Sequence, residues 1–288
     1  MAKKYDCIVI GAGPAGISSC LYLQQTKLKT LLIEKATPGG RIIQAPMVNN
    51  YAGYKGSGTD LALAMFENLD MEKIDFVIDE VLDINKNDEF AVTTKNEEYR
   101  SSFVITATGF VNKIIVPNQE EYLGRGVSYC ALCDASIAKG KTIMVYGNGP
   151  KCAEETAYLA TLAKCVYLVT DSINLSISNV ETIFNAKMER LAGNRVLTSI
   201  YFNNGQKLDV DMAFLYTGYV PATSFLQHLG VLNQNGLVDV DSDGQTKIKG
   251  LYAAGDVTNN NLKQVSTAVA SGAICATGII KEANHVIR

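Results

Sequence analysis

The sequence predicts an α/β fold, because a pattern of strand, glycine turn, helix and strand occurs twice. The first copy spans residues 5–34: an apolar run, a glycine-rich turn, a helical pattern and a second apolar run. The second copy spans residues 141–169 and has the same order. A further strand-like segment, 250–257, ends in Gly-Asp and precedes a helical stretch of small residues. These features predict an α/β chain that carries two nucleotide-type βαβ units, and the length allows one large domain or two ordinary ones.

Composition and charge exclude several classes of protein. The chain has 288 residues, of which 47% are hydrophobic and 19% charged, so it can bury a large core. Its net charge of -3 gives no overall positive field, and we expect no nucleic-acid partner. The long uncharged stretch 7–26 is broken by glycines and a proline, so we expect no membrane span. No cleavage pattern follows Lys3 and Lys4, and we expect a cytoplasmic protein.

Cysteine spacing singles out one pair. The chain has seven cysteines, and only Cys130 and Cys133 form a C-x-x-C motif. In a reducing compartment such a motif indicates redox or metal chemistry. A structural zinc site needs four ligands, whereas the two histidines, His228 and His285, are isolated and no second C-x-x-C occurs. We therefore expect a redox pair and no metal.

The first glycine turn has the residues of a dinucleotide site. Gly11 permits the tight turn, Gly13 lets backbone amides approach a pyrophosphate, and Gly16 lets the helix pack against the strand. Glu34 ends the second strand, 18 residues beyond Gly16, where a carboxylate accepts hydrogen bonds from a ribose. Two flanking strands and a terminal acid make this motif specific.

The order of several motifs resembles the low-molecular-weight thioredoxin reductase family. The matching segments are 11–16, Pro-Gly-Gly-Arg at 38–41, Asn-Tyr-Ala-Gly at 50–53, Ala-Thr-Gly at 107–109, the run 124–134 around the cysteines, and Gly-Asp at 255–256. The resemblance covers nearly the whole chain. It implies an α/β fold of the flavin disulfide reductase type with two nucleotide-binding three-layer domains. The FAD domain is then discontinuous, with parts at 1–112 and 236–288, and a degenerate NAD(P)H-like domain carrying the cysteines is inserted at 113–235.

The resemblance also implies which residues contact FAD. They are Gly11, Gly13, Pro14, Ala15, Gly16, Glu34, Lys35, Gly40, Arg41, Asn50, Ala107, Thr108, Gly109, Gly255, Asp256, Lys263, Gln264 and Val265. Asp256 would hold a ribityl hydroxyl, and the helix start at Lys263 and Gln264 would face a flavin carbonyl. Where the family usually has Arg, this chain has Lys263, which keeps the charge without the bidentate fork. A plain strand-turn-helix connection is the alternative for this segment.

For the redox pair, the resemblance implies a division of labour. Cys133 faces the flavin, Cys130 attacks the disulfide of thioredoxin, and Asp134 supplies or removes the proton. Asp134 as a simple helix cap is the alternative. The family also leads us to expect a homodimer.

The expected electron donor departs from the family, which ordinarily uses NADPH. No Lys or Arg occurs in 165–186, and Asp171 would repel a 2′-phosphate. The stretch 171–195 also looks too short to complete a nucleotide domain. We therefore expect reduced ferredoxin as the donor, as in similar thioredoxin reductase-like flavoproteins. Asp171, 22 residues after Gly149, favours NADH as an alternative. A flavin-bound redox sensor or interaction module without turnover is the third hypothesis.

Overall fold

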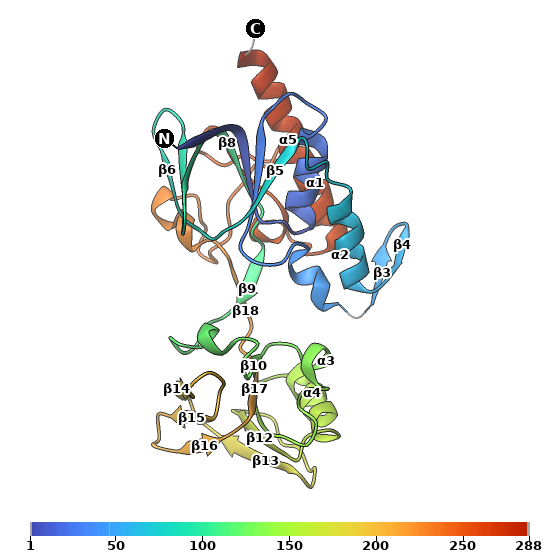
Figure 1. Ribbon diagram of the computed structural model, residues 1–288, viewed down its shortest axis with the longest axis vertical. Coiled ribbons are helices and arrows are strands. Elements are labelled where there is room, and N and C mark those ends of the chain that lie inside the picture. The colour runs from blue at the N-terminus through green and yellow to red at the C-terminus, as the bar shows by residue number, and fades with distance from the viewer. Residues whose placement is uncertain (1, 46, 287–288) are drawn as a thin grey trace. The chain divides into compact units, whose positions relative to one another are not determined.

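The chain forms two compact units. The computed structural model describes residues 2–45 and 47–286, apart from the side chains of 132–133 and 284–286. The terminal unit comprises Met1–Val111 and Val220–Arg288, and the inserted unit comprises Asn112–Tyr219 (Figure 1). Where the chain passes between them, β9 (Phe110–Asn112) pairs with β18 (Tyr219–Pro221). Both units combine helices with parallel strands, so the predicted α/β class is confirmed.

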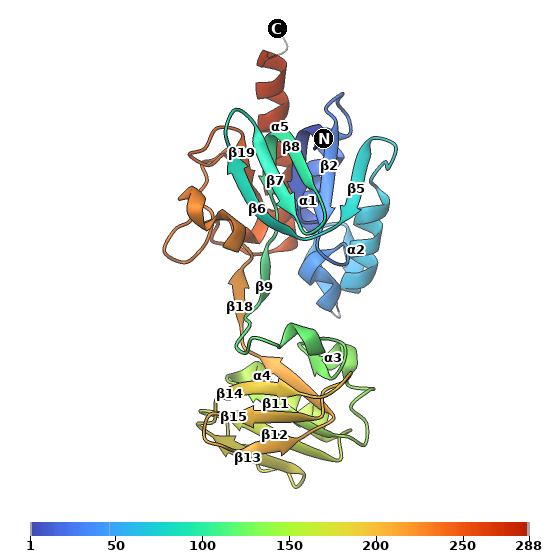
Figure 2. The same cartoon turned by 60° about the vertical axis from the view of Figure 1, so that its left-hand side comes forward.

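The terminal unit is built on a seven-stranded sheet in the order β5-β2-β1-β8-β7-β6, with β19 beside β8 (Figure 2). Its strands are β1 (Lys3–Ile10), β2 (Thr30–Glu34), β5 (Ile74–Ile78), β6 (Val81–Lys86), β7 (Phe90–Thr94), β8 (Glu98–Thr106) and β19 (Leu251–Ala253), and a separate hairpin joins β3 (Val48–Tyr51) to β4 (Tyr54–Gly56). Strands β5, β2, β1, β8 and β19 run parallel, whereas β6 and β7 are antiparallel additions. Because β19 pairs with β8, the last part of the chain completes the sheet begun by the first.

Helices cover one face of this sheet. They are α1 (Pro14–Leu23), α2 (Gly58–Glu67) and α5 (Val265–Val286), accompanied by the short 3-10 turns η1 (Gly40–Gln44), η3 (Ser224–Leu229) and η4 (Gly255–Val257). Helices α1 and α5 lie side by side (Figures 1 and 2). Gly272 allows their close approach because it has no side chain: a Cβ there would lie 2.1 Å from the Ala15 carbonyl oxygen. Ser19 Oγ also donates a hydrogen bond to the Gly272 carbonyl at 3.1 Å.

The second domain boundary needs a correction. We expected the insert to continue to residue 235, but residues 220–235 belong to the terminal unit. Phe225, Leu226 and Val231 are buried in the same apolar cluster as Ile8 and Leu31, on the sheet face that lacks the helices. This segment therefore covers the second face and gives the terminal unit its third layer.

The inserted unit has a five-stranded parallel sheet in the order β10-β17-β11-β12-β13. Its strands are β10 (Val127–Ser128), β11 (Thr142–Gly147), β12 (Cys165–Thr170), β13 (Val180–Phe184) and β17 (Met212–Tyr216), and its helical segments are η2 (Glu120–Tyr122), α3 (Ala131–Asp134) and α4 (Pro150–Ala160). The antiparallel strands β14 (Met188–Ala192), β15 (Ser199–Phe202) and β16 (Lys207–Asp209) form a small second sheet. One buried cluster lies beneath α3 and α4 and another joins the two sheets, which gives three layers.

One crossover in this unit has no helix. Strands β12 and β13 are parallel neighbours, yet residues 171–179 between them contain only bends and a turn. A parallel crossover is usually made by a helix. The strands expected of a nucleotide-binding sheet are present, but the helix that would follow β12 is not.

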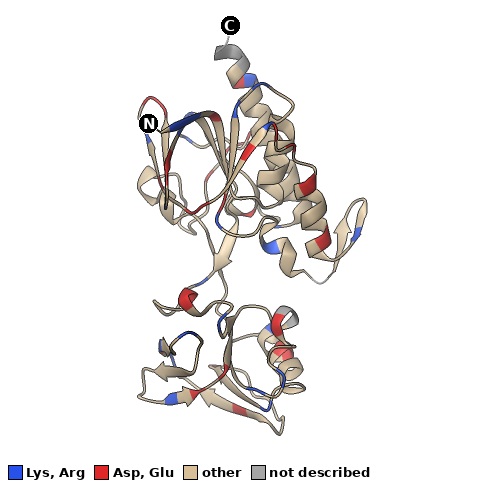
Figure 3. Ribbon diagram, viewed as in Figure 1, with Lys and Arg blue, Asp and Glu red and all other residues tan. Residues whose placement is uncertain are grey.

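No helix in the described part of the chain combines the length and apolar composition needed to cross a bilayer. Lys, Arg, Asp and Glu residues are spread over the ribbons of both units (Figure 3). Charge therefore does not divide the molecule into one basic and one acidic unit.

Candidate nucleotide and disulfide sites

The glycine turn before α1 leaves room for a pyrophosphate. Gly11 has a φ of +101°, and a Cβ there would lie 2.6 Å from the Ala107 carbonyl oxygen. A Cβ at Gly16 would lie 1.8 Å from the Gly11 carbonyl oxygen, so both positions need glycine for packing. At Gly13 an added Cβ meets no atom within 4 Å, and no side chain caps α1. An open approach to an uncapped helix start fits an anionic group.

Glu34 lies beside this turn at the end of β2. Its Oε2 accepts a hydrogen bond from the Ala12 N–H at 2.7 Å, and its Oε1 accepts one from the Ala36 N–H at 3.0 Å. These bonds fix the carboxylate while each oxygen keeps acceptor capacity for a ribose hydroxyl. The side chain of Lys35 points elsewhere, because its Nζ pairs with Glu80 at 2.8 Å. Lys35 would therefore contact a nucleotide through its backbone and not through its ammonium group.

Three distant segments converge on Asp256. A Cβ at Gly255 would lie 2.9 Å from the Cβ of Ala15, so η4 packs directly against the start of α1. Burial raises the pKa of the half-buried Asp256 carboxyl, and the positive charges of Arg41 and Lys263 oppose that rise. Burial likewise lowers the pKa of Lys263, opposed by Asp256. A carboxylate and two cations from three loops beside an uncapped helix fit the polar groups of FAD.

The remaining predicted FAD residues surround the same edge of the sheet. The loop containing Gly40 docks on the turn, because the Gly39 N–H donates to the Ala12 carbonyl at 2.7 Å. Asn50 Nδ2 donates to Gln264 Oε1 at 3.0 Å, just before Val265 begins α5. After β8, the Ala107 N–H donates to the Ile10 carbonyl at 2.8 Å, and Thr108 and Gly109 follow. The structure therefore gathers the predicted residues at one edge.

Sequence reasoning missed Ser271 on α5. Its Oγ accepts a hydrogen bond from the Gly255 N–H at 2.8 Å and so fixes the backbone before Asp256. A serine within a stretch of small helical residues gives no signal of this role.

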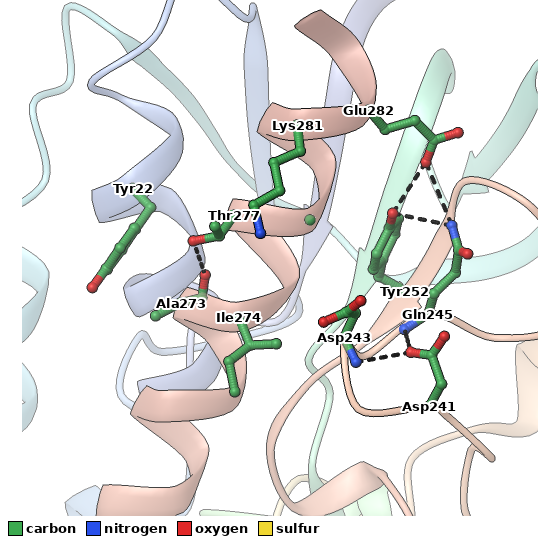
Figure 4. Close-up of a pocket in the computed structure, with 11 residues that line it drawn as sticks. Tyr22, Asp241, Asp243, Gln245, Tyr252, Ala273, Ile274, Thr277, Lys281 and Glu282 are labelled. Carbon is green, nitrogen blue, oxygen red and sulfur yellow. Dashed lines mark hydrogen bonds between the residues drawn. The ribbon is translucent and has the colours of Figure 1, made fainter. Parts of the chain in front are cut away.

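A cavity of about 610 Å³ lies elsewhere in the terminal unit, beside the carboxyl-terminal half of α5 (Figure 4). None of the predicted nucleotide residues lines it. Within it, Tyr252 donates to Glu282 Oε2 at 3.1 Å and accepts from Gln245 Nε2 at 3.0 Å. These bonds tie α5 to the 241–252 segment, so we assign the cavity a structural role.

Cys130 stands directly before α3 and takes part in a disulfide. Its N–H donates to Ser128 Oγ at 3.1 Å, and its carbonyl accepts from the Asp134 N–H at 3.2 Å, which closes one helical turn over the C-x-x-C. The Cys133 side chain lies outside the described residues. The half-buried Asp134 carboxyl is near enough in sequence to serve this pair, and its proton role stays a prediction.

The other cysteines are not built for exchange chemistry. Cys7, Cys20, Cys152 and Cys275 are free and buried, and Cys165 is free and half-buried. Burial raises the pKa of Cys152 to about 11, opposed by a hydrogen bond from Thr156. A thiol with a raised pKa is a poor nucleophile at neutral pH.

The glycine turn of the inserted unit is similar to the first but has a different neighbour. Gly149 has a φ of +88°, a Cβ there would meet no atom within 4 Å, and no side chain caps α4. Asn148 Oδ1 accepts from the Asp171 N–H at 2.9 Å, and its Nδ2 donates to Asp171 Oδ2 at 3.3 Å. An exposed carboxylate therefore stands at the end of β12.

His228, which the sequence left isolated, has a packing role: its Nε2 lies 3.0 Å from the Ile84 carbonyl oxygen. His285 has its side chain outside the described residues. Among the described side chains, no group of three or more His, Cys, Asp or Glu is arranged to hold a metal ion.

Two dinucleotide-type units and a cysteine pair define the class of two-domain disulfide oxidoreductases. The family model for pyridine nucleotide-disulphide oxidoreductases matches residues 5–272, and the chain belongs to this family. It is 33% identical to the thioredoxin reductase of Bacillus subtilis, over 96% of this chain and 94% of that protein. With the thioredoxin reductase of Mycoplasma genitalium, the identity is 34% over the same shares. The predicted resemblance to thioredoxin reductases is confirmed.

Solved structures give the same result. The crystal structure of Lactococcus lactis thioredoxin reductase in its FR conformation superposes with a TM-score of 0.72 and 29% identity, covering 96% of this chain and 98% of that one. A ferredoxin-flavin thioredoxin reductase from Clostridium acetobutylicum superposes with a TM-score of 0.59 and 28% identity, covering 99% and 100%. The chain is similar to both kinds of reductase along nearly its whole length.

Proposed function

We propose that the protein is a flavin-dependent thioredoxin-disulfide reductase. The carrying observation is that Cys130 is disulfide-bonded within a C-x-x-C motif, in the same chain as a cradle that fits FAD. The relatives named thioredoxin reductase support thioredoxin as the substrate. The family resemblance further leads us to propose a homodimer in the cytoplasm.

FAD is the cofactor, and we assign its binding to the cradle of the terminal unit. Gly13 and the start of α1 would face the pyrophosphate, Glu34 a ribose, and Asp256 the ribityl chain. Bound FAD would store an electron pair taken from the donor until the pair passes to the disulfide.

The proposed thiol-disulfide exchange takes place at the cysteine pair of the inserted unit. Two electrons and two protons convert the Cys130–Cys133 disulfide into two thiols. The Cys130 thiolate then attacks thioredoxin, forming a mixed disulfide and releasing one thioredoxin thiolate. Cys133 attacks Cys130 next, which restores the enzyme disulfide and releases reduced thioredoxin. Asp134 is proposed to take and return the exchanged proton.

We propose reduced ferredoxin as the electron donor. No Lys or Arg occurs in 165–186, and the exposed Asp171 carboxylate ends β12, where a 2′-phosphate needs cations. Each lost charge-assisted hydrogen bond costs about 1.5 to 3 kcal/mol. The missing helix after β12 and the similarity to the ferredoxin-flavin reductase point the same way. NADH is the second candidate, favoured by Asp171, because a carboxylate there suits a ribose diol.

A test of the reductase function should not depend on the donor. The FAD-loaded protein is reduced by light under anaerobic conditions and mixed with oxidised thioredoxin. We expect the flavin to reoxidise within seconds and four thioredoxin thiols to appear per flavin, because the fully reduced protein holds two electrons on the flavin and two in the dithiol. Reoxidation without thioredoxin thiols, or none at all, would favour a redox sensor or interaction module.

A further inference from the structure

We propose that Glu155, held by Tyr216, is a positioning residue that makes the Cys130 thiol of the reduced pair harder to ionise and so makes the dithiol more strongly reducing. This proposal deepens the proposed reductase function and rests on it. Glu155 and Tyr216 lie outside the C-x-x-C and its adjacent acid, and both belong to the inserted unit.

The geometry places the Glu155 carboxylate against the backbone that follows Cys130. Glu155 lies on α4 with its side chain only 15% exposed. Its Oε2 accepts a hydrogen bond from the Ala131 N–H at 3.3 Å and a short one from the Tyr216 hydroxyl at the end of β17. Three elements, α3, α4 and β17, thus meet at one carboxylate.

One phenol and one ammonium group lie beside the Glu155 carboxylate. Burial, together with the hydrogen bond to Glu155, raises the pKa of the Tyr216 hydroxyl, so the phenol remains a donor. Lys151 Nζ lies 3.6 Å from Glu155 Oε1, although its side chain is 70% exposed. The other titratable groups on these elements are the buried Cys152 and the exposed Glu154 and Tyr158 on α4, and Cys133 and Asp134 on α3. No described cation besides Lys151 pairs with this carboxylate.

The consequence for Cys130 follows from its covalent neighbour. The Ala131 N–H is the first amide after Cys130, and a thiolate gains stability from such free amides. Here that amide donates to Glu155, and a negative charge stands beside it. Both effects disfavour the Cys130 thiolate. A dithiol whose reduced form is not stabilised as a thiolate gives up its two electrons more readily.

The proposal is tested on the reduced, FAD-loaded protein by following alkylation of Cys130 with iodoacetamide against pH, using peptide mass spectrometry. We expect Glu155→Gln to lower the midpoint pH of Cys130 alkylation by roughly one unit, because it removes the charge and keeps the shape. The matched control is Glu154→Gln, an exposed neighbour on the same helix, which should leave the midpoint unchanged. An unchanged or raised midpoint in Glu155→Gln overturns the proposal.

Tyr216→Phe is a second variant, which tests the proposal even if Glu155→Gln does not fold. Tyr216→Phe keeps the carboxylate but removes its neutral donor, so the charge acts more strongly and the midpoint should rise; a fall or no change would contradict the proposal. Equilibration with glutathione should show a less negative disulfide potential for Glu155→Gln than for the parent protein. Alkylation needs neither thioredoxin nor an electron donor. If thioredoxin is not reduced but the midpoint shifts, only the proposed function fails.

Discussion

The two glycine-turn units of this chain have nearly the same local structure and different surroundings. In the terminal unit, α1 starts without a side-chain cap and Glu34 at the end of β2 is held by two backbone amides. In the inserted unit, α4 also starts without a side-chain cap, and Asp171 at the end of β12 is held by Asn148. Each has an open glycine position, at Gly13 and Gly149.

The difference between the two units lies in what the rest of the chain adds. Arg41, Asp256 and Lys263, from three segments, gather beside the first turn. After the second turn, residues 171–179 supply neither a helix nor a cation. A strand-turn-helix unit is thus only the frame of a nucleotide site, and distant segments supply the charged groups beside it.

The largest effect should separate the redox centre from the cofactor cradle. Cys130→Ser and Cys133→Ser are each expected to abolish thioredoxin reduction while flavin content, measured by absorbance, stays at the level of the parent. Each variant removes half of the exchange pair without touching the terminal unit. Cys152→Ser is the control, and its activity should persist because the buried Cys152 takes no part in exchange. If Cys152 proved essential for activity instead, the assignment of the redox centre to Cys130 and Cys133 would be wrong.

The two open glycines provide a direct comparison of the units. A methyl group at Gly13 enters the space assigned to the pyrophosphate, so Gly13→Ala should lower FAD affinity at least tenfold while the apoprotein unfolds at nearly the same temperature. Gly149→Ala should leave FAD affinity unchanged, but it should cost about 1 to 3 kcal/mol of stability, because the backbone at Gly149, with φ +88° and ψ 173°, suits only glycine. Equilibrium flavin titration and thermal unfolding measure both effects. Equal loss of flavin in the two variants would contradict the assignment of FAD to the terminal unit.

A smaller effect on flavin affinity and stability should distinguish Asp256 of the terminal unit from Asp171 of the inserted unit. Burial raises the pKa of Asp256 in the folded apoprotein, so ionised Asp256 destabilises the fold above that pKa, and stability recovers as pH falls through it. Asp256→Asn should therefore raise the apoprotein melting temperature slightly at pH 7 and flatten its dependence on acidic pH. FAD affinity should fall by roughly tenfold, since a charged acceptor is lost.

Asp171→Asn is the matched change in the inserted unit, because Asp171 is exposed at the equivalent strand end. Flavin affinity should not change. A loss of flavin in Asp171→Asn, or its retention in Asp256→Asn, would show that the two sites have been assigned to the wrong units.

The sequence predicted what depends on local pattern. Both glycine turns, their flanking strands and the cysteine pair follow from short-range spacing, and the structure has them as expected. Segment 220–235 was misplaced because Phe225 and Leu226 lie in a short 3-10 turn, with no period that shows which sheet they cover. Glu155 was missed because its spacing from Lys151 is that of an exposed helical ion pair. Only the tertiary structure places Tyr216 and Ala131 on its other side.

The central claim is that the terminal unit holds a working flavin and the inserted unit no longer serves NADPH. Anaerobic stopped-flow mixing of the FAD-loaded protein with reduced ferredoxin, NADPH or NADH in parallel tests it most directly. We predict rapid bleaching of the flavin by ferredoxin and bleaching at least a hundredfold slower by NADPH at micromolar concentration. Rapid bleaching by NADPH would contradict the claim, and rapid bleaching by NADH alone would replace ferredoxin with the donor that Asp171 favours.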